Sequence, residues 1–170
     1  IAFGGLPLRN LSVSPGGSRQ HIARDSIHQG LARGCHFVSV SPLDDDFSAA
    51  GNATRIRPRP GTDTALMLGM AHHLHVTGQA DEAYLARYTS GWYVLRDYLE
   101  GRADDIVKSP EGAEGICGVT AGEIRHLADE AAGKRTLITV AYGLQRAENG
   151  EQPVWMALAL SAMLGRADQQ

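Results

Sequence analysis

Two short segments, each following an apolar run, carry residues suited to binding a nucleotide or a phosphate. Gly5 and Pro7 belong to the turn GGLP, where missing side chains let a ligand approach backbone N–H groups closely. Ser41 and Pro42 follow the run HFVSVS. At that position an α/β nucleotide site often has an acidic residue that binds ribose hydroxyls.

Both segments also have ordinary interpretations. GGLP lacks the third glycine and the immediate helix of a dinucleotide fingerprint, so it could be a plain turn. Ser41 binds a ribose more weakly than a carboxylate does, and Asp44 and Asp45 are close enough in sequence to replace it. These aspartates could equally form a solvated acidic loop.

The string PGTD, which ends at Asp63, offers more specific chemistry. A carboxylate at the start of a helix is stabilised by free N–H groups, so Thr62 or Asp63 could simply cap the helix that follows. A carboxylate is also the group that pairs with the N1–H and the exocyclic amine of guanine. With Gly61, these residues form a candidate guanine-binding turn, and the two roles of Asp63 are compatible.

Histidines and cysteines could suggest a metal site, but their spacing argues against one. His72 and His75 share a helix face, yet no further ligand with suitable spacing accompanies them or His73, so we expect structural roles. Cys35 and Cys117 lie far apart, and we expect both to be small buried core residues rather than a disulfide or metal pair. Nothing in the chain forms a complete catalytic apparatus.

Alternating strands and helices must position these residues. Apolar runs predict strands at 2–4, at 36–41, at 54–60 as a short or edge strand because of its two prolines, and at 135–141. Helices are predicted from about Ser18 to Gly34 and over 64–76, and the final apolar helix covers 151–164. The sequence TAGE is a capping box that opens a helix at Thr120, which ends at Gly133.

This alternation predicts an α/β fold, a mainly parallel Rossmann-like sheet with helices on both faces. Ligands bind at the carboxyl ends of the strands in such sheets, so GGLPLRN, SPLDD, RPGTD and YGLQR should meet at one edge. We expect one domain over residues 1–170 that begins within its first strand, with a helical insertion at 81–118.

Composition excludes several functional classes. An apolar share of 43% with 21% charged residues is ordinary for a soluble globular protein. The net charge of -3 provides no basic stripe for nucleic acid, and no apolar run is long enough to cross a bilayer. Because the first residue is Ile1 rather than Met, the lack of a signal peptide says nothing about export, and the compartment stays open.

Several strings resemble the molybdopterin-dependent S- and N-oxide reductases, the family of dimethyl sulfoxide, trimethylamine N-oxide and biotin sulfoxide reductases. They occur in the family's order and cover nearly the whole chain: FVSVSP, RPGTDTALMLGMAHHL, DEAYLARYTSGW, YLEG, EGAEGICGVTAGEIRHLA and RTLITVAYGLQRAENGEQPVWMALALSAMLG. The combination of TDTALMLGMAH with GLQR, GEQ and WM is specific, whereas any one string alone is not.

The resemblance implies roles for individual residues in binding one of the two molybdopterin guanine dinucleotides that hold molybdenum. Gly5 and Pro7 correspond to the first cofactor loop, and Ser41 and Pro42 to the ribose contact. The guanine-facing turn corresponds to Gly61, Thr62 and Asp63, and the loop that approaches the pterin or its phosphates to Tyr142, Gly143, Gln145 and Arg146.

The resemblance also implies an internal segment of a larger enzyme. That enzyme would reduce a small S-oxide or N-oxide by oxygen-atom transfer to the molybdenum of bis(molybdopterin guanine dinucleotide). The family's metal-binding serine and its aromatic residues over the oxo group precede this segment, so we expect no catalytic residue and no metal ligand here. The implied partners are the remaining domains of the enzyme and its substrate.

Two other functions fit the strand and helix pattern. A free-standing nucleotide or sugar-phosphate binding module without redox activity predicts a complete sheet and measurable binding of guanine nucleotides. A structural domain of a multi-subunit complex would use the histidines and the helix at 64–76 as an interface. The truncated first strand counts against both, and the sequence identifies neither the oxide nor the electron donor.

Overall fold

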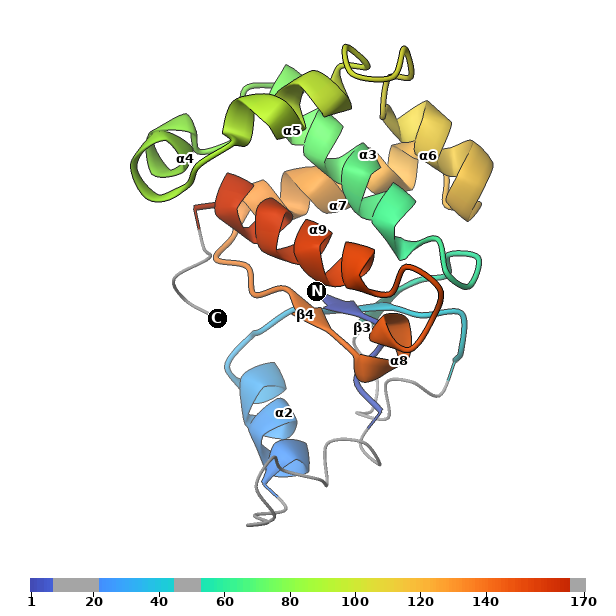
Figure 1. Ribbon diagram of the computed structural model, residues 1–170. Helices are drawn as coiled ribbons and strands as arrows, with labels where there is room; N and C mark the ends of the chain where they lie inside the picture. Colours follow the sequence, from blue (N-terminus) through green and yellow to red (C-terminus); the bar gives the residue numbers. More distant parts are fainter. Residues whose placement is uncertain (8–21, 45–52, 166–170) are drawn as a thin grey trace.

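The computed structural model describes residues 1–7, 22–44 and 53–165 (Figure 1). Four strands form one sheet: β1 (Ala2–Phe3), β2 (Phe37–Val40), β3 (Ala53–Ile56) and β4 (Thr139–Val140). Their order is β3-β2-β1-β4 and every pairing is parallel, with Ala2 opposite both Ser39 and Thr139. The predicted parallel α/β fold is confirmed, and the proline-bearing segment at 54–60 does supply a short edge strand.

Helices lie on both faces of the sheet. In Figure 1, α2 lies on one side, and α3, α7 and α9 lie on the other. The helices are α2 (Ala23–Ala32), α3 (Asp63–Val76), α4 (Glu82–Tyr88), α5 (Trp92–Leu99), α6 (Pro110–Cys117), α7 (Ala121–Gly133), α8 (Tyr142–Gln145) and α9 (Glu151–Met163). Among the described residues, no helix is both long and apolar enough to span a membrane.

The main core is built around α3. Leu66, Met67, Met70 and Leu74 are fully buried, because this helix packs against α6, α7 and α9 at once. A Cβ added at Gly69 would lie 2.8 Å from the Cβ of Ala113 in α6, so the glycine permits the close approach of the two helices. Burial of this apolar surface is the main stabilising contribution to the fold.

Three sequence predictions need correction. The strand expected at 135–141 is limited to Thr139–Val140, because its partner β1 has only two residues before Gly4 turns with φ +80°. The turn expected at YGLQR is the single-turn helix α8. Cys117 is buried as expected, but Cys35 is exposed, because it lies in the connection before the buried part of β2; both thiols are free.

Candidate binding site at the carboxyl edge of the sheet

A cavity of about 580 Å³ lies at the carboxyl edge of the sheet. Three of the four predicted segments line it. Pro42 follows β2, Gly61 and Asp63 connect β3 to α3, and Gly143 lies in α8 after β4. Parallel strands bring their carboxyl ends to one edge, which explains how residues a hundred positions apart in sequence share a wall.

Asp63 is the buried acid of this cavity. The residue is only 5% exposed, and it is the first residue of α3. Burial raises the pKa of its carboxyl to about 6, opposed by a hydrogen bond with its own backbone N–H. Within the described part of the chain, no other side chain pairs with the carboxylate. A buried charge costs free energy unless it is paired or hydrogen-bonded, so Asp63 is a candidate group for binding a ligand in the cavity.

A helix cap does not account for Asp63. The N-cap residue of α3 is Thr62, and its hydroxyl donates a 2.6 Å hydrogen bond to the Arg59 carbonyl instead of accepting one from the helix. Gly61 has φ +77°, which suits the third position of a type II turn after Pro60. The PGTD segment is therefore a tight turn that delivers the carboxylate to the cavity wall.

Two helices begin at this cavity. Asp63 and Thr64 are in the first turn of α3, and Gln152 and Pro153 are in the first turn of α9; all four line the cavity. In the described structure, neither helix has an N-cap side chain bonded to its first N–H groups. Helix N-termini carry partial positive charge and favour anions such as phosphates.

The glycine turn after β1 does not line the cavity. The Gly4 N–H donates to the Val40 carbonyl at 2.8 Å, and the Gly5 N–H donates to the Ala2 carbonyl at 3.2 Å. The expectation of exposed N–H groups is therefore wrong for this turn. A Cβ at Gly4 would lie 2.7 Å from the Cβ of Ala141, so this glycine permits close packing of the ends of β1 and β4. Gly5 and Pro7 are both buried.

The residues expected to contact ribose are already engaged. Ser41 is buried, its N–H donates to the Ile56 carbonyl, and its hydroxyl accepts a hydrogen bond from the Leu43 N–H. The Asp44 carboxylate accepts a 3.0 Å hydrogen bond from Arg57 Nε, so it is an ion-pair partner on the surface. Asp45 lies outside the described residues.

Three of the residues expected near the pterin are exposed and outside the cavity. Tyr142, Gln145 and Arg146 extend to the surface at α8, and Tyr142 is 73% exposed. Gly143 lines the same cavity as Asp63, so the structure does not separate a guanosine wall from a pterin wall.

Sequence reasoning missed five polar residues of the cavity: Thr64, Tyr98, Glu148, Asn149 and Gln152. Tyr98 lies in α5, which does not follow a strand, so its place in the sequence gave no indication of a binding site. Asn149 has φ 55°, a left-handed conformation that asparagine tolerates. The dipeptide NG directly before the final helix was a usable signal for a sharp turn at the cavity.

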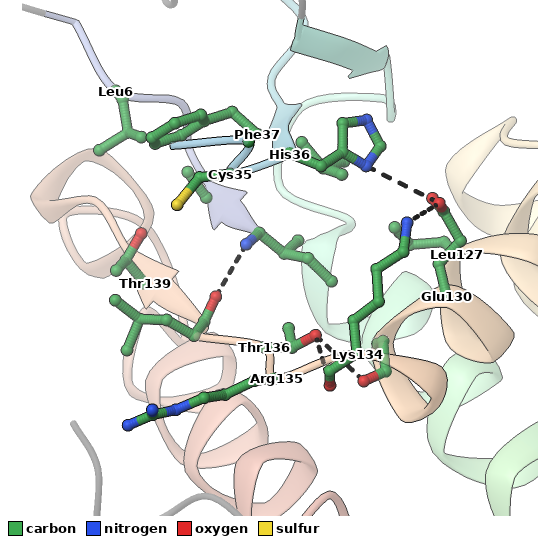
Figure 2. A pocket seen from close by; sticks show the side chains of 16 residues that line it. Leu6, Cys35, His36, Phe37, Leu127, Glu130, Lys134, Arg135, Thr136 and Thr139 are labelled. Atoms are coloured by element: carbon green, nitrogen blue, oxygen red, sulfur yellow. Dashed lines mark hydrogen bonds and ion pairs between the residues drawn. The ribbon is translucent and has the colours of Figure 1, made fainter. Parts of the chain in front are cut away.

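A second cavity, of about 530 Å³, lies at the opposite, amino ends of the strands (Figure 2). Several of its polar groups are bonded within the local structure. Lys134 Nζ and Glu130 Oε1 are 2.6 Å apart, His36 lies 3.7 Å from the same carboxylate, and the Thr136 hydroxyl donates to the Ala131 carbonyl. This arrangement is explained by the local structure, so the candidate site is the cavity that contains Asp63.

Two of the three histidines of α3 pair with carboxylates of other segments, whereas His72 Nδ1 is buried without a hydrogen-bond partner among the described residues. His73 Nε2 is 2.8 Å from Asp129 Oδ1, and His75 Nε2 is 2.8 Å from Glu100 Oε1. These contacts connect α3 to α7 and to the end of α5. Within the described ranges, no three His, Cys, Asp or Glu side chains are grouped to hold a metal ion.

Together, the parallel sheet and its helices define an α/β domain, and the cavity at the carboxyl edge is its candidate ligand-binding site. No protein-family model matches the chain. It is 39% identical to the biotin sulfoxide reductase of Cereibacter sphaeroides over 98% of its own length and 22% of the reductase. It is 39% identical to the trimethylamine-N-oxide reductase of Haemophilus influenzae, over 79% of the chain and 16% of that protein.

A third relative is the dimethyl sulfoxide/trimethylamine N-oxide reductase of Rhodobacter capsulatus, 35% identical over 86% of the chain and 18% of the enzyme. By sequence, the chain belongs to this family of S- and N-oxide reductases, and it spans about a fifth of the length of these relatives. The solved structure of acetylene hydratase from Pelobacter acetylenicus shares the fold, with a TM-score of 0.73 and 22% identity over 91% of the chain and 20% of the hydratase.

Proposed function

We propose that this chain is the segment of a molybdenum-dependent S- or N-oxide reductase that binds the guanosine end of a molybdopterin guanine dinucleotide. The observation that carries the proposal is the Asp63 carboxylate, which is buried on the wall of a cavity and has no side-chain partner among the described residues. The sequence similarity to S- and N-oxide reductases supports a molybdenum cofactor.

The cavity has the chemistry that a guanosine phosphate requires. A carboxylate can accept two hydrogen bonds from the N1–H and the exocyclic amine of guanine, and such charge-assisted bonds are strong. Pro42 and Pro60 provide apolar walls for the base. The N-termini of α3 and α9 suit the phosphates. Asp63 therefore acts as the guanine acceptor, and Pro42, Gly61 and Gly143 act as the surrounding contacts.

The remaining predicted residues have a secondary place in the proposal. Tyr142, Gln145 and Arg146 are exposed next to Gly143, on the side we assign to the pterin half of the cofactor. Gly5, Ser41 and Thr62 hold the turns near the strand ends through backbone hydrogen bonds, and Pro7 is buried beside the first of these turns. When bound, the cofactor supplies the oxygen-atom transfer chemistry. The described residues supply binding and orientation.

The direct experiment is chemical analysis of the complete protein encoded by the gene. We expect the purified protein to contain molybdenum and to release guanosine monophosphate on mild acid hydrolysis. A preparation that reduces an S-oxide or N-oxide but contains neither molybdenum nor a guanosine nucleotide would contradict the proposal. Reversible binding of free guanosine monophosphate by a molybdenum-free protein would favour a nucleotide-binding module instead.

A further inference from the structure

Arg59 bonds to the end of a helix that is distant in sequence. Its guanidinium Nη1 donates to the carbonyls of Gly115 at 2.8 Å and Ile116 at 3.0 Å, and its backbone N–H donates to the Cys117 carbonyl at 2.8 Å. The last four carbonyls of a helix have no partner within the helix. In α6 the fourth, that of Glu114, accepts from the Gly118 N–H, so Arg59 satisfies all of the others.

The same residue forms the start of the turn that delivers Asp63. The Arg59 carbonyl accepts hydrogen bonds from the Thr62 N–H at 3.2 Å and from the Thr62 hydroxyl at 2.6 Å. Pro58 and Pro60 flank Arg59 and have no N–H, so the backbone of this segment has few other donors with which to anchor itself. The Arg59 side chain also packs over Gly118, whose added Cβ would lie 3.4 Å from Arg59 Nε.

We propose that Arg59 is a positioning residue for the binding site, which holds the Pro60–Thr62 turn against the end of α6 so that Asp63 stays on the cavity wall. Its positive charge also interacts favourably with the partial negative charge of the helix C-terminus. The proposal rests on the proposed function for its effect on the cofactor. The coupling between Arg59 and Asp63 can be tested separately.

The first test measures nucleotide in the complete protein. We expect Arg59→Ala to lower the guanosine monophosphate released per protein toward about half of the native amount, because this segment is proposed to hold one of the two guanosines and losing charge-assisted hydrogen bonds weakens its placement. Arg59→Lys keeps the charge but not the two-carbonyl contact, so it should restore part of the nucleotide. Arg57→Ala is the matched control, because Arg57 lies in the same segment and pairs with Asp44 outside the cavity.

A control variant is needed to separate a general loss of stability from a loss of positioning of Asp63. Thr120→Ala removes the cap of α7, which contributes no residue to the cavity wall, and provides a destabilised protein with an unaltered turn. If Arg59→Ala loses no more nucleotide than Thr120→Ala at an equal fall in melting temperature, the positioning role is wrong.

The second test needs no cofactor. Asp63→Asn is made with and without Arg59→Ala, and melting temperatures of the nucleotide-free protein are compared in acid and at neutral pH. With Arg59 present, we expect Asp63→Asn to raise the melting temperature at neutral pH. In the Arg59→Ala background the rise should be at most half as large, because a carboxylate that is no longer held on the cavity wall reaches water. Equal gains in both backgrounds would overturn the proposal even if the native protein contained no guanosine nucleotide.

Discussion

Asp63 combines burial with a carboxylate that no other described side chain satisfies. A residue that only started a helix could stay in water, where its charge would cost nothing to maintain. Keeping the group buried lowers the stability of the protein without ligand and makes its hydrogen bonds to a bound base stronger, because water does not compete for them. The residue therefore has the properties of a binding group.

The pH dependence of stability follows from the pKa of this carboxyl, which burial raises from 3.8 to about 6. Below pH 3.8 the group is protonated in both folded and unfolded states, so the free-energy cost of burying a charged carboxylate is absent there. This cost lowers the stability of the folded state as pH rises through about 6. Asp63→Asn should therefore stabilise the nucleotide-free protein at neutral pH by up to about 3 kcal/mol, at 1.36 kcal/mol per pKa unit.

Urea unfolding at several pH values measures this effect. Glu148 and Tyr98 line the same cavity and are unchanged in the variant, so the difference between the two proteins reports Asp63 alone. Asp44→Asn is the control, because that carboxylate is exposed. An Asp63→Asn protein with the same neutral stability as the native protein would show that the carboxylate is hydrated.

Sequence reasoning at the residue scale named residues that line the cavity where a residue's place in the chain decides its surroundings. Asp63 follows a strand and starts a helix, and Pro42 follows a strand, so both were named. Ser41 and Asp44 occupy equally suggestive positions, but their engagement by Leu43 and Arg57 depends on side-chain geometry that spacing does not contain.

At the scale of elements, α3 connects the core to the binding site. It begins at Asp63 on the cavity wall and packs along its length against α6, α7 and α9. Its apolar residues surround the helix, which is the pattern of a helix buried on all sides. Changes to the packing of α3 therefore act on both stability and the placement of Asp63.

Gly69→Ala tests the close packing of α3 against α6. The added Cβ would lie 2.8 Å from the Cβ of Ala113 and 3.3 Å from Cγ2 of Ile124, so the helices must separate. We expect a loss of about 1–3 kcal/mol in unfolding free energy. Gly122→Ala is the matched control, because its Cβ would meet nothing within 4 Å, and it should stabilise α7 by up to about 1 kcal/mol. Equal effects of the two substitutions would show that α3 and α6 are not closely packed.

The capping box of α7 gives a further prediction. Thr120 Oγ1 accepts from the Glu123 N–H, and Glu123 Oε2 accepts from the Thr120 N–H at 3.1 Å. Thr120→Ala removes the first of these bonds and should lower the unfolding free energy by about 1 kcal/mol. Nucleotide content should not change, because no described residue of α7 lines the cavity. A thermal or urea unfolding curve identical to that of the native protein would contradict the role of this cap.

Local signals decided which elements could be predicted. The capping box at Thr120 and the apolar helix at 151–163 depend on neighbouring residues, and the structure has both. The length of β4 depends on a strand more than a hundred residues away, and the helix at YGLQR depends on how the chain leaves that strand. Such tertiary effects are absent from a single-sequence pattern.

At the scale of the whole molecule, the strand directions determine where the site lies. An all-parallel sheet has one carboxyl edge, and the cavity there joins the ends of β2, β3 and β4. α5 also contributes Tyr98, so we propose that the helical insertion at 81–118 forms part of the cavity as well as part of the core. The parallel topology followed from the alternation of strands and helices, whereas the contribution of α5 could be found only from the structure.

The measurement that tests the central claim most directly is the amount of guanosine monophosphate released per protein by the complete native enzyme and by its Asp63→Ala variant. Because this segment is proposed to hold only one of the two guanosines of the cofactor, the variant should release about half as much as the native protein. Asp44→Ala should release the native amount, since Asp44 pairs with Arg57 outside the cavity. An Asp63→Ala protein that retains both guanosines would contradict the claim that Asp63 binds guanine.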